Sequence, residues 1–227
     1  MKLALFDLDH TLLDGDSDSL WGRFLVREGV VDGAKYAEAN SRYYAEYRAG
    51  RLDIHEFLAF GLRPLRDNPP AVLEAWRRRF VAEYILPRIP DGTRTLLARH
   101  AEHTRAIITA TNSFITAPVA VELGVPHLIA TEPEHVDGRF TGRVAGVPCF
   151  REGKVTKLAE WLERNRLTPS ETWFYSDSHN DLPLLEQVTH PVAVNPDEVL
   201  TAVARERGWP VMRLRVNGET DSMLGAA

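Results

Sequence analysis

Four short apolar runs stand out along the chain, and each leads directly into polar residues. Continuous apolar runs of this length are typical of parallel strands that are buried on both faces of a sheet. Between the runs, apolar residues recur at helical spacing. Strands that alternate with helices predict an α/β fold with a doubly wound, Rossmann-like parallel sheet. The runs and the polar residues that follow them are 3–6 with Asp7, 106–108 with Thr109, 172–175 with Ser176 and Asp177, and 192–194 with Asn195.

The segment after the first run interrupts this alternation. It has no convincing strand pattern, and its apolar residues recur at helical spacing in three stripes, at 20–25, 54–62 and 72–80. A helical module inserted directly after the first strand is therefore predicted. Further along the chain, the tight-turn dipeptide Asp137-Gly138 predicts a short β-hairpin within residues 136–147.

Turn-forming residues set the predicted domain limits. Asp14-Gly15-Asp16 precedes the helical module, and Pro87 and Pro90 follow it. The predicted division is an α/β core domain at 1–14 and 86–215, a helical cap domain at 15–85, and a loose polar tail at 216–227.

The composition narrows the possible partners. The 227 residues are 44% hydrophobic and 26% charged, which is ordinary for a globular protein. The net charge is −5 and no long basic run is present, so a nucleic-acid partner is not expected. The densest basic cluster, Arg77-Arg78-Arg79, falls in a helical pattern and is interpreted as a solvated helix face.

The number of cysteines and the N-terminal sequence predict the cellular compartment of the protein. Cys149 is the only cysteine, so an internal disulfide is excluded and nothing indicates a zinc site built on thiolates. The N-terminus lacks the long apolar stretch of a secretory signal, and no apolar run has membrane-spanning length. The prediction is a cytoplasmic protein without a membrane partner, either a monomer or a homodimer.

The polar residues that end the apolar runs carry the candidate chemistry. In an open parallel sheet, ligands bind outside the carboxyl ends of the strands, so these residues are expected to converge on one crevice. Clustered carboxylates repel one another unless a cation lies among them, and oxygen-only ligation suits Mg²⁺. The expected cluster comprises Asp7, Asp9, Thr109, Asp177 and Asp181.

A mechanism follows from the spacing of the first two carboxylates. Alternation along an extended chain places Asp7 and Asp9 on one side, one as a nucleophile and one free to handle a proton. A carboxylate nucleophile divides a hydrolysis into two transfers through an aspartyl-phosphate. Thr109 and Lys154 could hold the charged phosphoryl oxygens. Lys154 follows Gly153 at a helix start and is preferred to Lys157, one turn later, for this role.

Four motifs in order resemble those of the haloacid dehalogenase superfamily. They are Asp7-Leu8-Asp9-His10-Thr11, Thr109 after an apolar strand, Lys154 in Arg151-Glu152-Gly153-Lys154-Val155, and Ser176-Asp177-Ser178-His179-Asn180-Asp181. The helical insert after the first motif is similar to the small cap of the phosphoserine-phosphatase-like branch. That branch includes phosphoserine phosphatases and some bacterial histidinol-phosphate phosphatases.

The resemblance implies a role for each matched residue. Asp7 would be the nucleophile and a Mg²⁺ ligand, and Asp9 would be the general acid and base, with its backbone carbonyl on the metal. Thr109 and Lys154 would bind the phosphoryl oxygens, and Asp177 would bind Mg²⁺. Asp181, with Asn180 beside it, would support a metal-bound water or steady Lys154.

The resemblance also indicates residues for the substrate's leaving group. Asp16 falls where phosphoserine phosphatases have a glutamate that meets the substrate amine, and it is one methylene shorter. Thr109-Ala110-Thr111-Asn112 stands where the phosphoserine phosphatases have a glycine-rich run after the hydroxyl residue, so Ala110 and Asn112 are substrate-binding candidates and a different mode of holding a substrate carboxylate is implied.

Several neighbouring residues are given structural roles. Thr111 and Ser113 are expected to cap the helix after the second motif. His10 and His179 flank the acidic cluster without an assigned role. Trp21, Trp76 and Trp161 are expected to be helix core residues, and Trp21 could face the crevice.

The predicted function is Mg²⁺-dependent hydrolysis of a small phosphorylated metabolite, with histidinol phosphate and phosphoserine as first candidates. A cap would exclude water and bulky phosphoprotein substrates. The alternatives are a receiver-like phospho-aspartate signalling module, a phosphomutase, and a nucleotide-sugar transferase that uses Asp7 and Asp9 for its metal. Asp9 and the helical insert oppose the receiver, and the transferase leaves Lys154 unexplained.

Overall fold

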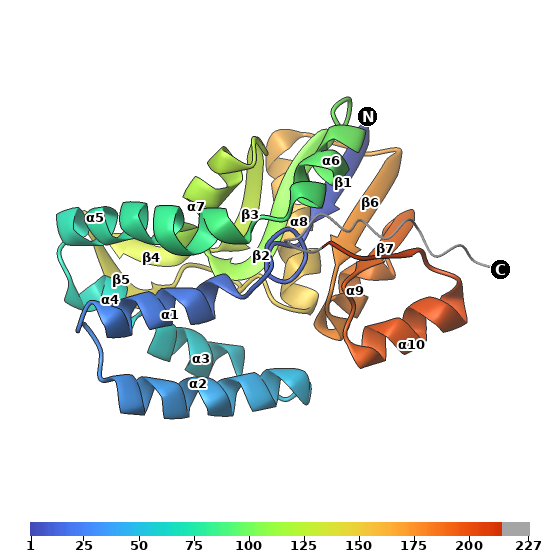
Figure 1. Ribbon diagram of the computed structural model, residues 1–227. Coiled ribbons are helices and arrows are strands. Elements are labelled where there is room, and N and C mark those ends of the chain that lie inside the picture. The colour runs from blue at the N-terminus through green and yellow to red at the C-terminus, as the bar shows by residue number, and fades with distance from the viewer. Residues whose placement is uncertain (215–227) are drawn as a thin grey trace.

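A six-stranded sheet forms the centre of the computed structural model, which describes residues 1–214 (Figure 1). The strand order is β3-β2-β1-β6-β7-β8, and every neighbouring pair is parallel. This arrangement confirms the predicted doubly wound sheet. The predicted tail at 216–227 lies outside the described residues. The strands are β1 (Lys2–Phe6), β2 (Thr104–Asn112), β3 (His127–Thr131), β6 (Glu171–Ser176), β7 (His190–Val194) and β8 (Val211–Met212).

The four apolar runs correspond to β1, β2, β6 and β7, whereas β3 and β8 were not predicted. β8 has two residues, which is too short to carry an alternation pattern. β3 begins with partly exposed His127 and Leu128, so its buried portion is only three residues long. Both strands pair on one side only, at the two edges of the sheet. Edge strands of this length depend on their neighbours more than on their own pattern.

Helices cover both faces of the sheet (Figure 1). Successive strand residues point to opposite faces, so Phe6 lies in one apolar cluster and Leu5 in the other. The Leu5 face packs against α8, α9 and α10, and the Phe6 face packs against α6, α7 and α1. The core helices are α6 (Asp91–Arg99), α7 (Ser113–Glu122), α8 (Glu152–Asn165), α9 (Leu182–Leu185), α10 (Glu198–Arg207) and the short 3₁₀ helix η3 (His179–Asp181).

The segment between β1 and β2 is helical before α6 begins. Figure 1 places α2 and α3 in a layer beyond α1, on the side away from the sheet. Asp16, Asp32 and Asp53 cap α1, α2 and α3 by accepting from backbone N–H groups. α2 was not predicted, because Tyr43 is its only buried residue and its apolar stripe is weak. The elements are α1 (Ser17–Arg27), α2 (Gly33–Arg48), α3 (Ile54–Gly61), α4 (Arg63–Asp67), α5 (Pro70–Phe80), the π-helical turn η1 (Val81–Ile85) and the 3₁₀ turn η2 (Leu86–Arg88).

The helical segment packs against the core through α7 and a hairpin. The ring of Trp21 stacks on Phe24 and meets the edge of Phe114 on α7. The hairpin consists of β4 (Pro133–Val136) and β5 (Arg139–Val144), so it begins three residues before the predicted 136–147 range. Its turn has positive φ at Asp137 and Gly138, and it lies against α4. The division into cap and core domains stays a prediction.

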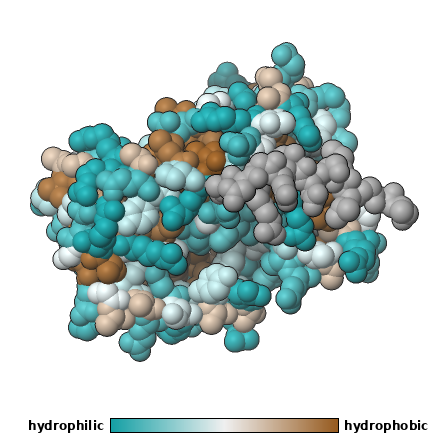
Figure 2. Space-filling model, in the orientation of Figure 1, coloured by the Kyte–Doolittle hydropathy of each residue, from teal (hydrophilic) through white to brown (hydrophobic). Residues whose placement is uncertain are grey.

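Figure 2 shows a largely hydrophilic face with small hydrophobic patches. Among the helices of residues 1–214, none combines the length and the apolar character needed to cross a membrane. The prediction of a wholly solvated arginine triplet is wrong for Arg77, which donates to the Phe114 carbonyl oxygen at 3.0 Å and lies over that ring. Arg79 instead pairs with Glu28 on the surface.

A buried histidine makes the stability of the fold depend on pH. His100 Nε2 is 2.7 Å from the Tyr175 hydroxyl, and His100 Nδ1 is 2.8 Å from His103 Nδ1. Burial, with His103, Arg99 and Arg105 nearby, lowers the pKa of His100 to about 4. Because the neutral form is favoured in the folded state, its stabilisation is complete above the unfolded pKa and is lost as pH falls through about 6.5 toward 4.

We therefore expect the free energy of unfolding to fall by up to about 3 kcal/mol between pH 7 and pH 4 on account of His100. Urea titrations at several pH values would measure this slope. His100→Gln should flatten it, and His55→Gln, at an exposed position on α3, should leave it unchanged. Equal slopes in all three proteins would contradict the prediction.

Candidate active site

A cavity of about 1110 Å³ opens at the carboxyl ends of β1, β2 and β6. This is the edge of a parallel sheet at which ligands bind. The cavity is also lined from the helical segment, including Trp21, Tyr47 and Phe57. The predicted residues that line it are Asp7, Asp9, Asp16, Thr109, Ala110, Lys154, Asp177, Asn180 and Asp181. The structure therefore brings all the predicted site residues together except Asn112.

Lys154 holds two buried carboxylates at the base of the cavity. Its Nζ donates to Asp7 Oδ1 and to Asp181 Oδ2, both at 2.7 Å. The side chain enters from the first turn of α8 and is 3% exposed. Although burial opposes the charge, Asp181 and Asp7 raise the pKa of Lys154, so it stays an ammonium. Lys157 does not line the cavity, which leaves Lys154 as the amine of the site.

Asp7 and Asp177 approach each other across a shared hydroxyl. Thr11 Oγ1 lies 3.5 Å from Asp7 Oδ2 and 3.4 Å from Asp177 Oδ1. Burial raises the pKa of Asp7 to about 7 against the opposing effect of Lys154. Burial also raises the pKa of Asp177, with Asp7 and Asp181 adding to the effect. Crowded, desolvated carboxylates of this kind favour a nearby cation.

The donor set is compatible with an open cation site. Within residues 1–214, no group of three or more His, Cys, Asp or Glu side chains is arranged to hold a metal ion by itself. Mg²⁺ does not need one, because it commonly takes one or two carboxylates and completes its shell with water and phosphate oxygens. The carboxylates of Asp7 and Asp177 fit that requirement.

Two hydrogen-bond donors hold the Asp9 carboxylate. One of them is Thr111, which was predicted to cap a helix. Asp9 Oδ1 accepts from the Ser17 backbone N–H at 2.7 Å, and Asp9 Oδ2 accepts from Thr111 Oγ1 at 2.8 Å. Thr111 therefore belongs to the cavity and does not cap α7. The prediction missed that β2 continues to Asn112, with an irregular register after Thr109, and that Thr109 and Thr111 both line the cavity.

The residue that caps α7 and the role of Ser113 also differ from the prediction. Asn112 caps α7, because its Oδ1 accepts from the Ile115 backbone N–H at 3.3 Å, and it does not line the cavity. Ser113 is the first residue of α7 and donates to Glu132 Oε2 at 2.5 Å. Thr109 is buried, and its Oγ1 accepts from the Thr111 backbone N–H at 3.2 Å.

Two further carboxylates, at the start of α1, line the cavity. Asp16 Oδ1 accepts from the Ser19 backbone N–H at 2.7 Å, and Asp18 Oδ2 lies 3.3 Å from Thr111 Oγ1. Burial raises the pKa of Asp16 to about 6 and raises that of Asp18 well above its usual value, and neighbouring carboxylates add to both shifts. Within the described chain, neither forms an ion pair with a lysine or arginine. The sequence reasoning missed Asp18, although it lies two residues after Asp16.

The two histidines of the motifs also line the cavity. His179 Nδ1 is 2.7 Å from Asp197 Oδ2, which also accepts from the His179 backbone N–H at 2.9 Å. The ring of His179 is thus oriented by Asp197. The backbone of His10 has a positive φ of 56°, and its carbonyl oxygen accepts from Asn195 Nδ2 at 3.1 Å.

Fold and site together define a doubly wound α/β protein with a carboxylate and amine centre at the carboxyl ends of its strands. A family model for haloacid dehalogenase-like hydrolases matches residues 4–186. The chain therefore belongs to the haloacid dehalogenase-like hydrolase family.

Individual relatives agree with this assignment. The chain is 45% identical to a histidinol-phosphatase of Neisseria meningitidis serogroup C over 220 residues, covering 94% of this chain and 99% of that protein. It is 35% identical to the phosphoserine phosphatase SerB1 of Mycobacterium tuberculosis, covering 94% of this chain and 71% of the relative. A Bordetella pertussis protein of unknown function has a crystal structure with a TM-score of 0.87 and 45% identity, covering 92% of this chain and 97% of that one.

Proposed function

We propose that this chain, a phosphatase of the haloacid dehalogenase-like family, hydrolyses a small phosphorylated amine through an aspartyl-phosphate on Asp7. Histidinol phosphate is the first candidate substrate and phosphoserine the second. The observation that carries the proposal is the position of Asp7, whose carboxylate is held by Lys154 and lies beside Asp177 at the base of the cavity. An amine next to a carboxylate nucleophile supplies the positive charge that a transferred phosphoryl group requires.

The proposed reaction has two steps. First, a carboxylate oxygen of Asp7 attacks phosphorus, the bond to the ester oxygen breaks, and Asp9 gives its proton to the departing alcohol. Second, Asp9 takes a proton from water, whose oxygen attacks phosphorus and releases phosphate from Asp7. The Ser17 and Thr111 hydrogen bonds hold the Asp9 carboxylate in place for both proton transfers.

Mg²⁺ is proposed as the cation of this site, held by the carboxylates of Asp7 and Asp177. When bound, it would neutralise charge on the phosphoryl oxygens. Lys154, whose Nζ contacts Asp7 Oδ1, would bind the phosphoryl oxygens, and Thr109 lies on the cavity wall near the end of β2.

The charge of the cavity favours a substrate that carries an amine. Asp16 and Asp18 lie at the start of α1 and line the cavity, and an ammonium group could pair with both. Histidinol phosphate has an amine and an imidazole but no carboxylate, whereas phosphoserine also brings a carboxylate that needs a positive partner. The higher identity to a protein named histidinol-phosphatase supports the same order of candidates.

Phosphate release from a panel of phosphorylated metabolites, with Mg²⁺ and with a chelator, tests the proposed function. Histidinol phosphate should be hydrolysed with the highest kcat/KM, and chelation should abolish turnover. Turnover that survives exhaustive chelation would exclude the metal. A substrate that is isomerised without phosphate release would identify a phosphomutase, and a phosphoenzyme that persists for minutes would favour a receiver-like switch.

Asp18→Asn is expected to raise KM for histidinol phosphate about tenfold, because one charged partner of the ammonium is removed. Hydrolysis of p-nitrophenyl phosphate, which has no amine, should change less than about twofold on the same reasoning. Steady-state kinetics with both substrates would measure the difference. An equal loss for both substrates would contradict a role in amine recognition.

A further inference from the structure

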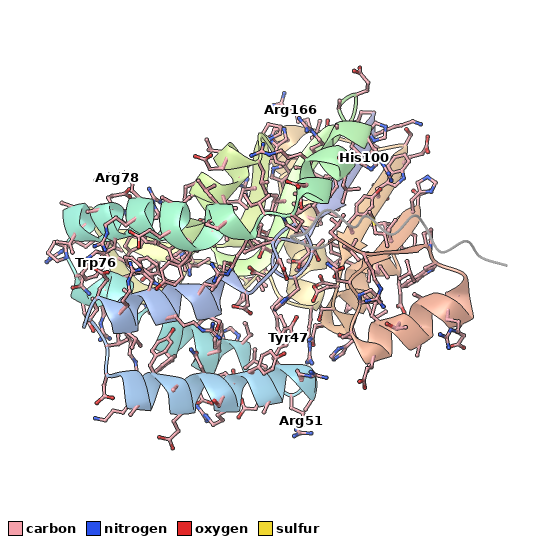
Figure 3. The ribbon with its side chains drawn as sticks, in the orientation of Figure 1. Tyr47, Arg51, Trp76, Arg78, His100 and Arg166 are labelled. Carbon is pink, nitrogen blue, oxygen red and sulfur yellow. The ribbon has the colours of Figure 1, made fainter. Side chains whose placement is uncertain are left out.

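Arg151 and Tyr47 connect the helical segment to the loops that carry the active site. Tyr47 lies in the last turn of α2, and Arg151 directly precedes α8, three residues before Lys154. Figure 3 shows Tyr47 at the end of α2 that faces the core, whereas Arg51 points away from it. Neither residue has a part in the proposed two-step reaction.

The Arg151 guanidinium bridges two separate segments. Its Nε donates to Asn180 Oδ1 at 3.0 Å, and its Nη2 donates to the Gly50 carbonyl oxygen just after α2. It also lies over the ring of Phe150, 5.2 Å from the centroid. Gly50 has a φ of +64°, and a Cβ there would lie 3.2 Å from Arg151 Nη2. The close approach therefore depends on glycine.

Tyr47 makes a second connection to the same loop. Its hydroxyl donates to Ser178 Oγ at 2.8 Å, and its carbonyl oxygen accepts from Asn180 Nδ2 at 3.4 Å. Burial raises the pKa of Tyr47, so its hydroxyl remains a donor at neutral pH. Ser178 is next to Asp177, and Asn180 is next to Asp181. The end of α2 is thus bound to the loop that presents both carboxylates.

A short chain of hydrogen bonds continues from this loop to Lys154. The Ser178 backbone N–H donates to Ser176 Oγ at 3.2 Å, and Ser176 Oγ donates to Asp181 Oδ2 at 2.6 Å. The same Asp181 oxygen accepts from Lys154 Nζ at 2.7 Å. A change in the position of α2 therefore has a contiguous physical path to the amine that holds Asp7.

We propose that Arg151 is a positioning residue that, together with Tyr47, couples the docking of α2 to the alignment of Lys154 and the 177–181 loop. The term clasp denotes Tyr47, Gly50, Arg151, Ser178 and Asn180. With the clasp formed, α2 covers the cavity, and Lys154 and the 177–181 loop are aligned to bind phosphate. With the clasp broken, α2 and the catalytic loops lose that coupling. The inference rests on the proposed function, since the aligned groups are those that bind phosphate.

Arg151→Gln removes the bridge and can be compared with a closely matched control. Arg166 is at the other end of α8 and also has a positive φ, 54° against 52° for Arg151. It is exposed and lies far from Tyr47 in Figure 3. Arg166→Gln therefore makes the same chemical change on the same helix away from the clasp. Tyr47→Phe is a milder second substitution, which removes only the hydroxyl that donates to Ser178. It tests the clasp if Arg151→Gln does not fold.

Kinetics provide the first readout. Arg151→Gln should lower kcat for histidinol phosphate about tenfold or more, because charged hydrogen bonds that align the site are lost. KM should change less than about threefold, and Tyr47→Phe should lower kcat by a smaller factor. Arg166→Gln should match the wild type. Urea unfolding of each variant would establish the folded fraction to which the rates are normalised.

Hydrogen exchange provides a readout that a merely structural role would not change. Inorganic phosphate with Mg²⁺ should slow backbone exchange at residues 47–51 in the wild type and in Arg166→Gln. In folded Arg151→Gln that slowing should be lost, although phosphate still binds. If Arg151→Gln and Tyr47→Phe both kept the wild-type exchange response and kcat, this inference would be overturned and the proposed function would be unaffected. A wild-type protein that releases no phosphate from any substrate would overturn the proposed function as well.

Discussion

Replacement of Asp7 by asparagine is expected to lower phosphate release at least about 10³-fold, the scale on which loss of a nucleophile acts in covalent catalysis. The amide cannot form the phosphoryl bond, and it also withdraws one carboxylate from Lys154. Initial rates with saturating histidinol phosphate and Mg²⁺ would measure the loss. Acid quenching with radiolabelled substrate should trap a phosphoenzyme in the wild type and none in the variant.

Asp67→Asn is the matched control for this substitution. Asp67 is at the end of α4, exposed and paired with Arg66 on the surface, outside the cavity. Such a pair contributes little to stability, so activity and folding should be unchanged. Metal-dependent turnover by Asp7→Asn at more than about one-tenth of the wild-type rate would exclude nucleophilic catalysis by Asp7.

Lys154→Met is expected to lower kcat about 10²- to 10³-fold, because the phosphoryl group loses its positive partner. It should also reduce the free energy of unfolding by about 3–5 kcal/mol, since two buried carboxylates lose their ammonium. Phosphate release would report the first effect. Urea denaturation at neutral pH would report the second.

Lys157→Met separates the amine of the site from its neighbour on the same helix. Lys157 is partly exposed and does not line the cavity, so both kcat and stability should remain close to wild type. If Lys157→Met were inactive and Lys154→Met active, the assignment of the phosphate-binding amine would be reversed. If both were active, neither lysine would bind the phosphoryl group.

The sequence predicted the centre of the fold because buried parallel strands have a local signature. The run that ends at Asp7 is apolar at every position, and the same holds before Thr109. Parallel strands end at a common edge, so the order of polar residues along the chain already implied a shared crevice. The local sequence pattern could not predict α2, which has little buried surface, or the edge strands β3 and β8.

The sequence alone determined which residue types stand at the ends of the central strands, and with them the core of the candidate site. Only the tertiary structure decided that Thr111 meets Asp9, that Asn112 caps a helix, and that Asp18 faces the cavity. The clasp at Arg151 was likewise absent from any local pattern, because its contacts join residues 29 to 133 positions apart in the sequence. Strand patterns record burial along a short stretch, whereas these contacts depend on how distant segments pack.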